Sequence, residues 1–390
     1  MTKRLAVIGG GASAALLVAN LARLSADVSV DVYDRTGRFA RGVAYSTGHE
    51  RHLLNVRAAN MSAYHDDKDH FASWAMARGY APMDFVPRVL YGHYLEEQLE
   101  QAEARISVRR IGEDVLSCVR EGRSFTLQTL SGAVAYDNVV LASGNVRALE
   151  PRHSSGMTGY YNDPWSADFD HLKNISSIAL IGSGLTAVDM VLALNAQGYG
   201  GKILVFSRNG LFPARHVDPV PFSSFLSAED ECAPPHVLLS LIRKTIARAD
   251  VPWQSVIDSL RPHTNAIWQS WGATQRERFN KRLLTFWNVH RHRMAPQIAD
   301  IVDGFRSAGR LVSVKGGVSC IEAGPVVQST GGRFDVDAVI NCLGYRYEEA
   351  GRAYDVGARL GPARFGELFE TTAIPEIRMQ ARMLAEELAQ

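Results

Sequence analysis

Two glycine-rich turns constrain the fold of this chain more than any other feature. One lies in "LAVIGGGASAALLVANL" (5–21) and the other in "ALIGSGLTAVDMVLAL" (179–194). Each sets a Gly-x-Gly-x-x-Ala pattern between an apolar segment typical of a strand and a segment typical of an apolar-faced helix. The small residues of the two patterns are Gly9, Gly11, Ala14, Gly182, Gly184 and Ala187.

Such a turn favours dinucleotide binding for steric and electrostatic reasons. The first glycine permits the tight turn, the second removes a side chain where a pyrophosphate approaches, and the third small residue lets the helix pack on the strand. The helix N-terminus then offers free N–H groups to the phosphates. Both copies have the strand-turn-helix context that the pattern requires, and 390 residues exceed the usual size of one core. We therefore predict an α/β protein with two Rossmann-like dinucleotide-binding domains.

The residues that end the second strand of each unit differ, and the difference predicts two cofactors. Asp34, followed by Arg35, ends the first unit, where a carboxylate accepts hydrogen bonds from a ribose and repels a 2′-phosphate. Ser207 and Arg208 end the second unit, and a hydroxyl with a guanidinium suits a 2′-phosphate. We expect FAD in the first unit and NADPH in the second, the alternative for Arg208 being a solvated arginine at a strand end.

The order of elements predicts a discontinuous first domain. Residues 1–173 and 343–390 are expected to bind FAD, and residues 174–342 to bind NADPH. Residues 228–307 have a helical texture and are too long for a loop, so we expect a helical insertion in the second domain. The segments "ISVRRI", "DVLSCVRE" and "SFTLQTL" predict a small antiparallel sheet. The last helix carries an apolar stripe of Ile377, Ala381, Leu384 and Leu388.

Composition excludes several classes of function. The net charge of +1 gives no electrostatic footprint for nucleic acid or an anionic membrane, and no apolar run approaches the length of a membrane span. The four cysteines form neither a C-x-x-C pair nor a metal-ligand spacing, which argues against a disulfide reductase and a metal site. No Ser-His-Asp set stands out. Because the glycines interrupt the N-terminal apolar stretch, a signal peptide is not expected and the cytoplasm is the predicted location.

Several sequence blocks resemble a known family. In chain order, from about residue 5 to 388, the chain is similar to a bacterial FAD/NAD(P)-binding protein family, related to two-dinucleotide-binding flavoproteins such as N-hydroxylating and Baeyer–Villiger monooxygenases. The blocks that carry this resemblance are "GVAYS", "HLLNVRAANMSA", "VPRVLYGHYL", "DPW", "IGSGLTAVDMVLAL", "FSRNGLFPARH", "TFWNVHRHRMAP" and "ETTAIPEIRMQA". Relatives carry a longer segment between "NCLGYRY" and "GPARFGELFE", which leaves the flavin edge less covered here.

The resemblance implies positions for cofactor contacts. Val115 is expected to contact adenine through its backbone, and Gly144 to mark the crossover towards the second domain. Arg215 and His216 are expected near the 2′-phosphate, with a purely structural turn as the alternative. The FAD neighbours implied by "HLLNVRAANMSA" and "VPRVLYGHYL" are Leu54, Asn55, Met61 and Arg88, with a packed loop capped by Asn55 as the alternative.

The start of the last helix has a predicted electrostatic role. Pro375 suits a first helical turn. In this architecture the helix start faces the flavin pyrimidine ring, where the positive dipole end stabilises the anion of reduced flavin. The backbone N–H groups near Ala373 and Ile374 are expected to do this, and packing of the same helix as a capped surface helix is compatible with it.

The segment "RERFNKRLLTFWNVHRHRMAP" supplies the candidate catalytic residues. If it is one helix, Phe279, Phe286 and His290 share an inward face, while His292 points away. A hydrogen-bonded core histidine is one interpretation of His290. The other is that His290, with Arg291 or Arg293, lines the cleft where nicotinamide, flavin and an anionic substrate meet.

The function implied by the resemblance is an FAD- and NADPH-dependent oxidoreductase. NADPH would reduce FAD, and a C4a-hydroperoxyflavin formed with O2 would oxygenate a small substrate, amine-bearing or anionic, as in a monooxygenase. The cofactor would carry the chemistry. Two alternatives stay open: a flavin reductase or dehydrogenase without oxygen insertion, and a non-enzymatic redox-sensing dinucleotide-binding protein.

Overall fold

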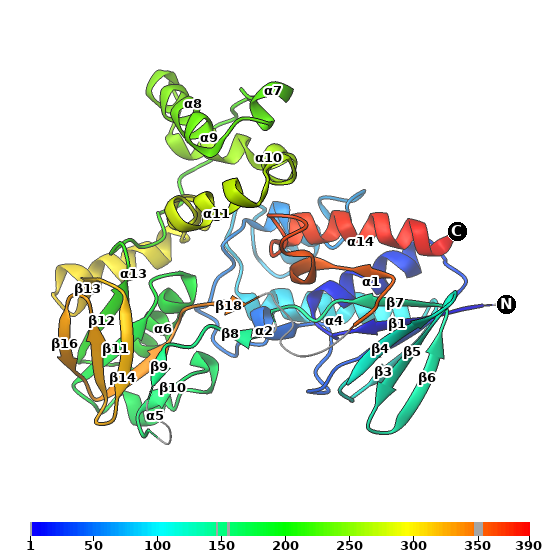
Figure 1. Ribbon diagram of the computed structural model, residues 1–390, viewed down its shortest axis with the longest axis horizontal. Helices are drawn as coiled ribbons and strands as arrows, with labels where there is room; N and C mark the ends of the chain where they lie inside the picture. The colour runs from blue at the N-terminus through cyan, green and yellow to red at the C-terminus, as the bar shows by residue number, and fades with distance from the viewer. Residues whose placement is uncertain (1, 146, 154–156, 347–353) are drawn as a thin grey trace. The chain divides into compact units, whose positions relative to one another are not determined.

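The computed structural model describes residues 2–145, 147–153, 157–346 and 354–390 (Figure 1). The chain forms two compact units. Unit 1 consists of Met1–Arg147 and Arg346–Gln390, and unit 2 of Ala148–Tyr345. Each unit has its own parallel sheet, so the predicted α/β fold with two Rossmann-like domains is confirmed.

The boundaries of the units differ from those expected. The first lies at 147/148 instead of 173/174, and the second at 345/346 instead of 342/343. Strands β9 (Arg152–His153) and β10 (Tyr160–Tyr161) explain the first shift, because β9 pairs with a strand of unit 2 at Cys320 and β10 with one at Val339. Residues 148–173 therefore belong to the unit with which they share hydrogen bonds.

Unit 1 is built on a five-stranded sheet with the order β19-β7-β1-β2-β3. All its neighbouring strands pair in parallel. The strands are β1 (Lys3–Ile8), β2 (Val28–Tyr33), β3 (Ser107–Ile111), β7 (Asn138–Leu141) and β19 (Ala358–Arg359). The prediction for "ISVRRI" was wrong: this segment is β3, which extends the parallel sheet beside β2, and does not join the antiparallel one.

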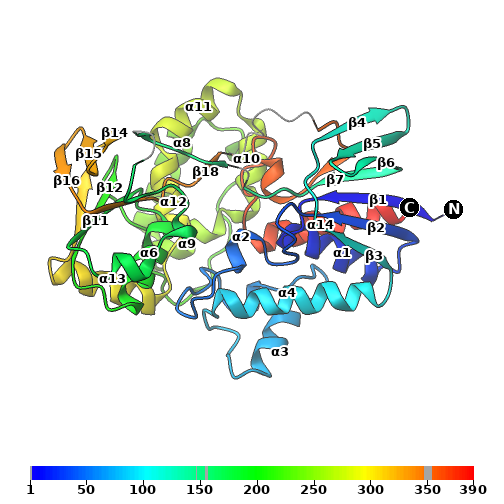
Figure 2. The ribbon, with the colours of Figure 1, turned by 90° about the horizontal axis from the view of Figure 1, so that it is seen from below.

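A three-stranded antiparallel sheet follows β3 in unit 1. It contains β4 (Ser117–Glu121), β5 (Ser124–Thr129) and β6 (Gly132–Tyr136). Between β2 and β3 the chain forms α2 (Gly42–Tyr45), η1 (Ala58–Asn60), α3 (His70–Met76) and α4 (Arg88–Glu103). Figure 2 shows α3 beside α4, where Phe71 contacts the rings of Tyr91 and Tyr94.

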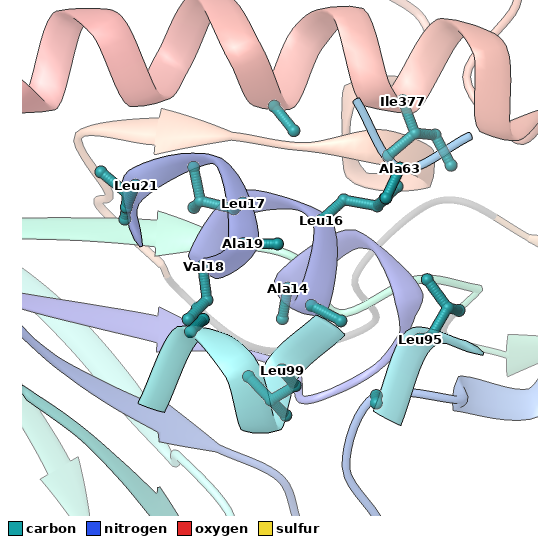
Figure 3. Packing of buried hydrophobic residues seen from close by; sticks show 14 of the residues in the cluster. Ala14, Leu16, Leu17, Val18, Ala19, Leu21, Ala63, Leu95, Leu99 and Ile377 are labelled. Carbon is teal, nitrogen blue, oxygen red and sulfur yellow. The ribbon is translucent and has the colours of Figure 1, made fainter. Parts of the chain in front are cut away.

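The core of unit 1 forms around α1 (Ala12–Arg23), which connects β1 to β2. Figure 3 shows α1 between α14 (Ile374–Ala389) and α4, with Leu17 and Leu21 on the α14 side and Val18 on the α4 side. The expected apolar stripe of the last helix is confirmed, because its four residues are at most 9% exposed. Burial of this stripe fixes α14 along α1.

The sheet of unit 2 has the order β10-β17-β11-β12-β13, in which β17, β11, β12 and β13 take the places of β7, β1, β2 and β3 of unit 1, while the edge strand β10 precedes the others in the chain instead of following them. Its further strands are β11 (Ser177–Ile181), β12 (Lys202–Ser207), β13 (Leu311–Lys315) and β17 (Ala338–Asn341), and α6 (Leu185–Ala196) connects β11 to β12. A second sheet has the order β16-β15-β14-β9, with β14 (Val318–Glu322), β15 (Val326–Ser329) and β16 (Gly332–Asp335). The sequence did not single out β14.

The predicted helical insertion lies between β12 and β13 of unit 2. It contains α7 (Ala228–Glu231), α8 (Pro235–Arg248), α9 (Trp253–Ser259), η3 (Arg261–His263), α10 (Thr264–Ser270), α11 (Ala273–Arg282), α12 (Leu284–Arg291) and α13 (Pro296–Ser307). Shorter elements of the unit are η2 (Pro164–Ser166) and α5 (Phe169–Leu172), while η4 (Gly361–Arg364) lies in unit 1. The linking strands β8 (Arg147–Ala148) and β18 (Tyr345–Arg346) pair with each other.

Over the described parts of the chain, no helix combines the length and apolarity that crossing a membrane needs.

A buried carboxylate joins the two sheets of unit 1. Asp31, on β2, accepts two hydrogen bonds from Arg109 of β3, at 2.7 and 2.5 Å, and one from the Tyr136 hydroxyl at 2.6 Å. Burial and the nearby Asp31 charge raise the pKa of Tyr136, so this hydroxyl stays protonated and donates. Tyr33 then donates to Tyr136, because Tyr136 has given its only proton to Asp31.

We expect Asp31→Asn to lower the free energy of unfolding by about 2 kcal/mol, because it weakens a hydrogen-bonded ion pair whose carboxylate side chain is only 3% exposed. Glu103→Gln is the matched control. It removes the charge from a bidentate pair with Arg110 at the surface, where a loss below about 1 kcal/mol is expected. Urea denaturation measures both, and equal losses would contradict the network.

Candidate dinucleotide-binding sites

The first glycine of each turn is fixed by the strand that follows later in the chain. Gly9 and Gly182 have φ values of 102° and 109°, a left-handed region that side chains disfavour. A Cβ on Gly9 would overlap the carbonyl oxygen of Ala142, after β7, and one on Gly182 would overlap that of Cys342, after β17. Both positions therefore require glycine for two independent reasons.

The backbone hydrogen bonds around the two turns correspond one to one. The N–H of the first glycine donates to a carbonyl at the end of β2 or β12. The residue that follows β7 or β17 donates its N–H to the carbonyl of the last residue of β1 or β11. The bonds are Gly9 to Tyr33 at 2.8 Å, Gly182 to Phe206 at 2.8 Å, Ala142 to Ile8 at 2.7 Å and Cys342 to Ile181 at 2.8 Å. The two turns are thus the same structure built twice.

Both helices that follow the turns begin without a side-chain cap. Gly11 and Gly184 are the N-cap residues of α1 and α6, and both have extended backbones. A Cβ on Gly184 would meet nothing within 4 Å, whereas one on Gly11 would meet only the backbone of Gly42. The first N–H groups of each helix have no intrahelical partner. This leaves donors and space of the kind that a pyrophosphate needs.

The third small residue of each pattern is buried between helix and sheet. Ala14 is 1% exposed and Ala187 is fully buried. A larger side chain at either position would separate the helix from its strand.

Asp34 follows β2 and is partly engaged by its own turn. Its Oδ2 accepts the Gly10 N–H at 3.0 Å, and its Oδ1 accepts the Thr36 N–H and hydroxyl at 2.8 and 2.6 Å. A carboxylate oxygen accepts two hydrogen bonds, so Oδ2 retains capacity for one more donor. Arg35, the next residue, is exposed.

The end of β12 has the opposite charge. Arg208 is exposed and makes no ion pair or hydrogen bond with any other described residue. Lys315 ends β13 in register with Ser207, and it too is exposed and unpaired within the described chain. Lys315 was not among the residues predicted from the sequence, although a lysine that closes the strand-like "RLVSVK" was a usable signal. Two uncompensated cations therefore flank a hydroxyl at this edge.

Two polar side chains beside the first turn were also not predicted as site residues from the sequence. Ser143 Oγ and Asn145 Oδ1 are buried and lack a hydrogen-bond partner among the described residues. They flank Gly144, whose φ is 70°, at the end of β7 and beside Gly9. Buried polar atoms are almost always hydrogen-bonded, so these two atoms suit a bound polar ligand.

The start of α14 lies close to the start of α1. Gly361 connects them: its N–H donates to Gln380 of α14 at 3.1 Å, and a Cβ there would overlap Ser13 of α1. Ala373 is the N-cap residue of α14 and, like Gly11, gives no side-chain cap, while Ile374 is 2% exposed. Unit 1 thus has two helices, α1 and α14, that begin without a side-chain cap.

The remaining FAD candidates lie in unit 1 with different exposures. Leu54 and Met61 are each 2% exposed and belong to the hydrophobic core, as the packed-loop alternative expects. Arg88 donates from Nε to the Leu53 carbonyl at 3.1 Å, and Asn55 is half-buried with its own partner. Val115 is buried, and its carbonyl accepts the Tyr354 hydroxyl at 2.7 Å. Residues 347–353 of the short segment before Gly361 lie outside the described residues.

Arg215 and His216 are held by the helical insertion. Arg215 pairs with Asp300 of α13, and its backbone lies beside Met294 in an isolated bridge. The His216 N–H donates to the Met294 carbonyl at 2.9 Å. The turn is therefore ordered by contacts with the protein itself.

The candidate catalytic segment is two helices, not one. The helix is interrupted at Leu283, between α11 and α12. The prediction of which side chains point inward, made for one continuous helix, was therefore wrong. Phe286 is 46% exposed instead of inward. His292 is sheltered instead of outward: burial and the charges of Arg291, Arg261 and Arg293 lower its pKa to about 4, so it is neutral at pH 7.

The three candidate catalytic residues, His290, Arg291 and Arg293, differ in their hydrogen bonds and in their burial. His290 Nδ1 lies 2.7 Å from the Phe286 carbonyl, which accepts only, so Nδ1 carries the proton and Nε2 is an acceptor. Its ring meets Trp253 edge to face. Arg293 is 2% exposed and makes two 2.6 Å bonds to Asp258. Arg291, at the end of α12, is half-buried.

The described residues contain no cluster of side chains suited to metal binding, and their cysteines are free thiols. Cys118 and Cys342 are buried, and burial raises the pKa of the Cys118 thiol to about 11. No group of three or more metal-ligating side chains occurs among the residues described.

The geometry therefore defines a protein with two dinucleotide-binding folds, and comparison with known proteins agrees. Residues 6–146 match the model of the FAD-NAD(P)-binding family, so this part of unit 1 is an FAD/NAD(P)-binding domain, as predicted. A search of curated proteins found no match.

Solved structures with the same fold cover the whole chain. The ornithine N-hydroxylase from Kutzneria sp. 744 is 13% identical with a TM-score of 0.64, over 100% of this chain and 99% of that one. The ornithine hydroxylase from Pseudomonas aeruginosa is 14% identical with a TM-score of 0.64 over the same shares. The bacillithiol disulfide reductase from Staphylococcus aureus is 12% identical with a TM-score of 0.60, over 99% and 98%. At these identities the likeness establishes the fold.

Two alanine substitutions in the second turn should separate folding from binding. Gly182→Ala should lower the free energy of unfolding by about 2 kcal/mol, because the methyl group overlaps the Cys342 carbonyl. Gly184→Ala should leave stability nearly unchanged but weaken NADPH at least about tenfold, because its methyl group takes the space left for phosphate. Thermal unfolding and fluorescence titration measure the two effects. Unchanged NADPH affinity in the second variant would contradict the assignment.

Proposed function

We propose that the protein is an FAD- and NADPH-dependent oxidoreductase that acts as a monooxygenase on a small substrate. The observation that carries the proposal is the contrast between two equivalent turns, one ending in Asp34 and the other in Ser207, Arg208 and Lys315. When bound, FAD supplies the electron transfer between NADPH and O2. The neighbours named as ornithine hydroxylases support the choice of oxygenation.

Unit 1 has the donors and acceptors that FAD needs. The uncapped start of α1 donates to the pyrophosphate, and Asp34 Oδ2 accepts from a ribose hydroxyl. Ser143 and Asn145 supply polar atoms that the protein itself leaves unpaired. The start of α14, at Ala373 and Ile374, supplies a positive dipole end for the negative charge of the reduced ring.

Unit 2 selects the phosphorylated dinucleotide by charge. Arg208 and Lys315 bind the 2′-phosphate, while Ser207 donates a hydrogen bond. Arg215 and His216 border the same site in this proposal, with Arg215 oriented by Asp300. A carboxylate is absent from the described strand ends at this edge, in contrast to unit 1.

The insertion contributes the substrate side of the reaction. His290, protonated on Nδ1, offers Nε2 as an acceptor for a substrate proton. Arg291 supplies positive charge for an anionic substrate. Arg293, locked onto Asp258, acts as a positioning residue that holds the end of α12.

The cysteines agree with a cytoplasmic location within this proposal. All four are free thiols, as is usual for proteins kept in a reducing compartment. The same fold supports reductases, so the oxygenation step needs its own experiment.

Arg208→Ala and Lys315→Ala should each weaken NADPH by about 10- to 100-fold and leave NADH unchanged, because each removes a charge-assisted hydrogen bond to the 2′-phosphate. Steady-state KM values for the two nucleotides measure this. Arg243→Ala, which removes an exposed arginine of α8, is the control and should change neither value. Equal losses for NADPH and NADH would show that these cations do not read the phosphate.

Oxygen insertion is tested by incubating the purified protein with added FAD, NADPH, isotope-labelled O2 and a panel of small amines, ketones and carboxylates. We expect NADPH oxidation to rise with one substrate class and its product to gain one labelled oxygen atom by mass spectrometry. Oxidation of NADPH with no labelled product would leave a reductase. Failure to bind FAD would exclude both enzymes and leave a redox-sensing protein.

A further inference from the structure

The helical insertion brings together a serine, a histidine and a glutamate in one hydrogen-bonded row. Ser224 Oγ lies 2.6 Å from His263 Nε2, and His263 Nδ1 lies 2.5 Å from Glu231 Oε1. Ser224 comes from the loop after β12, Glu231 from α7 and His263 from η3. All three belong to unit 2. The expectation that the chain has no such set is therefore corrected, since its members are too scattered in sequence to be recognised there.

The bonds of the row fix where the proton of the imidazole lies. A carboxylate only accepts, so the bond to Glu231 requires a proton on His263 Nδ1. In neutral His263, Nε2 is then an acceptor, and Ser224 donates its hydroxyl proton to it. This is the arrangement in which a histidine acts as the general base for a serine nucleophile.

The helix that carries the carboxylate is held by contacts independent of the row. The Glu231 carbonyl accepts the Ser270 hydroxyl at 2.8 Å, and the Trp271 indole donates to the Ala233 carbonyl at 2.9 Å, so α7 is tied to the end of α10. A capping box between Ser227 and Asp230 orders the start of α7. Positioning on hydrogen-bonded elements keeps the three groups aligned before any substrate arrives.

The nucleophile is accessible while its partners are sheltered. Ser224 is exposed, whereas the side chains of His263 and Glu231 are 18% and 27% exposed. The N–H of Phe225, the residue after the serine, makes no hydrogen bond to another described residue and can donate to a developing oxyanion. Phe222 and Phe225, both half-buried, provide apolar surface next to Ser224 in the chain.

We propose that Ser224, His263 and Glu231 form a second active site, which hydrolyses carboxylic esters with an apolar acyl or aryl group. Ser224 Oγ attacks the carbonyl carbon and passes its proton to His263 Nε2. The ester C–O bond breaks, the leaving alkoxide takes that proton, and an acyl ester remains on Ser224. A water molecule then attacks this ester, gives one proton to His263 and releases the carboxylic acid, after which the proton returns to Ser224.

The site is distinct from the dinucleotide-binding turns. Its residues lie on the loop, α7 and η3, and none of the glycine-turn or strand-end residues takes part in it. The reaction consumes only ester and water, so it needs neither FAD nor NADPH.

A fluorophosphonate probe and a chromogenic ester test the proposal on the full-length protein. The probe should form one covalent adduct, located at Ser224 by peptide mass spectrometry. Hydrolysis of p-nitrophenyl butyrate should fall about 100-fold or more in Ser224→Ala and in His263→Ala, and by a similar order in Glu231→Gln. Ser223→Ala, which changes the neighbouring exposed serine, is the matched control and should retain both labelling and activity.

The outcomes that overturn the proposal are distinct. An unlabelled Ser224, or hydrolysis in Ser224→Ala equal to that of the unchanged protein, shows that the row only fastens the loop to the insertion. Labelling at Ser224 that persists in His263→Ala shows that the serine reacts without the triad. Melting temperatures within a few degrees of the unchanged protein for Ser224→Ala and Glu231→Gln exclude unfolding as the cause of lost activity.

Discussion

The contact between a glycine and a carbonyl group at the end of a neighbouring strand organises both halves of this protein. Gly9 lies against Ala142, and Gly182 lies against Cys342, with a left-handed backbone in each case. Any side chain at Gly9 would push β7 away from β1, and any side chain at Gly182 would push β17 away from β11. With glycine, the first strand can turn directly into its helix, and the helix N-terminus opens at the carboxyl edge of the sheet. The whole βαβ arrangement and its binding edge depend on this close approach.

Once this backbone is fixed, the chemistry of each half is set by a few strand-end residues. The first half has Asp34, partly occupied by its own turn, and the second has Ser207 with two exposed cations. A duplicated scaffold thus presents opposite charges at equivalent positions. In the proposed function, electrostatics at one edge, rather than the fold, distinguishes the two dinucleotides, because a carboxylate repels a 2′-phosphate while cations attract it.

Local patterns predicted the parts of the fold whose cause is local. The turns, the strand Ser177–Ile181 and the apolar stripe of the last helix follow from periodicity and glycine spacing. The predictions failed where a distant partner decides. Strand β3 alternates like an antiparallel strand, but its hydrogen bonds go to β2, 78 residues away at Ser29 and Ser107. A short window of sequence, of the length used to recognise a strand, cannot contain both β2 and β3.

The candidate site shows the same division. Glycines and strand-end charges could be read from motifs, whereas Lys315 became visible only through its register with Ser207. The break at Leu283 reversed the exposure expected for Phe286 and His292, because the helical period restarts there. Ser143 and Asn145 carry no motif at all, and only the burial of their polar atoms marks them.

The Ser224, His263 and Glu231 row in the insertion also depends on contacts between residues that are distant in sequence. Its three members are joined by side-chain bonds that no spacing rule encodes, but each bond restricts the next: the carboxylate sets the tautomer, and the tautomer leaves the acceptor that the serine needs. Because the row is complete within unit 2, its reactivity can be measured without any dinucleotide. Loss of flavin-dependent oxidation would therefore leave the hydrolytic site intact, and an inert Ser224 would leave the two dinucleotide-binding turns unchanged. The two proposals stand on separate contacts and fail separately.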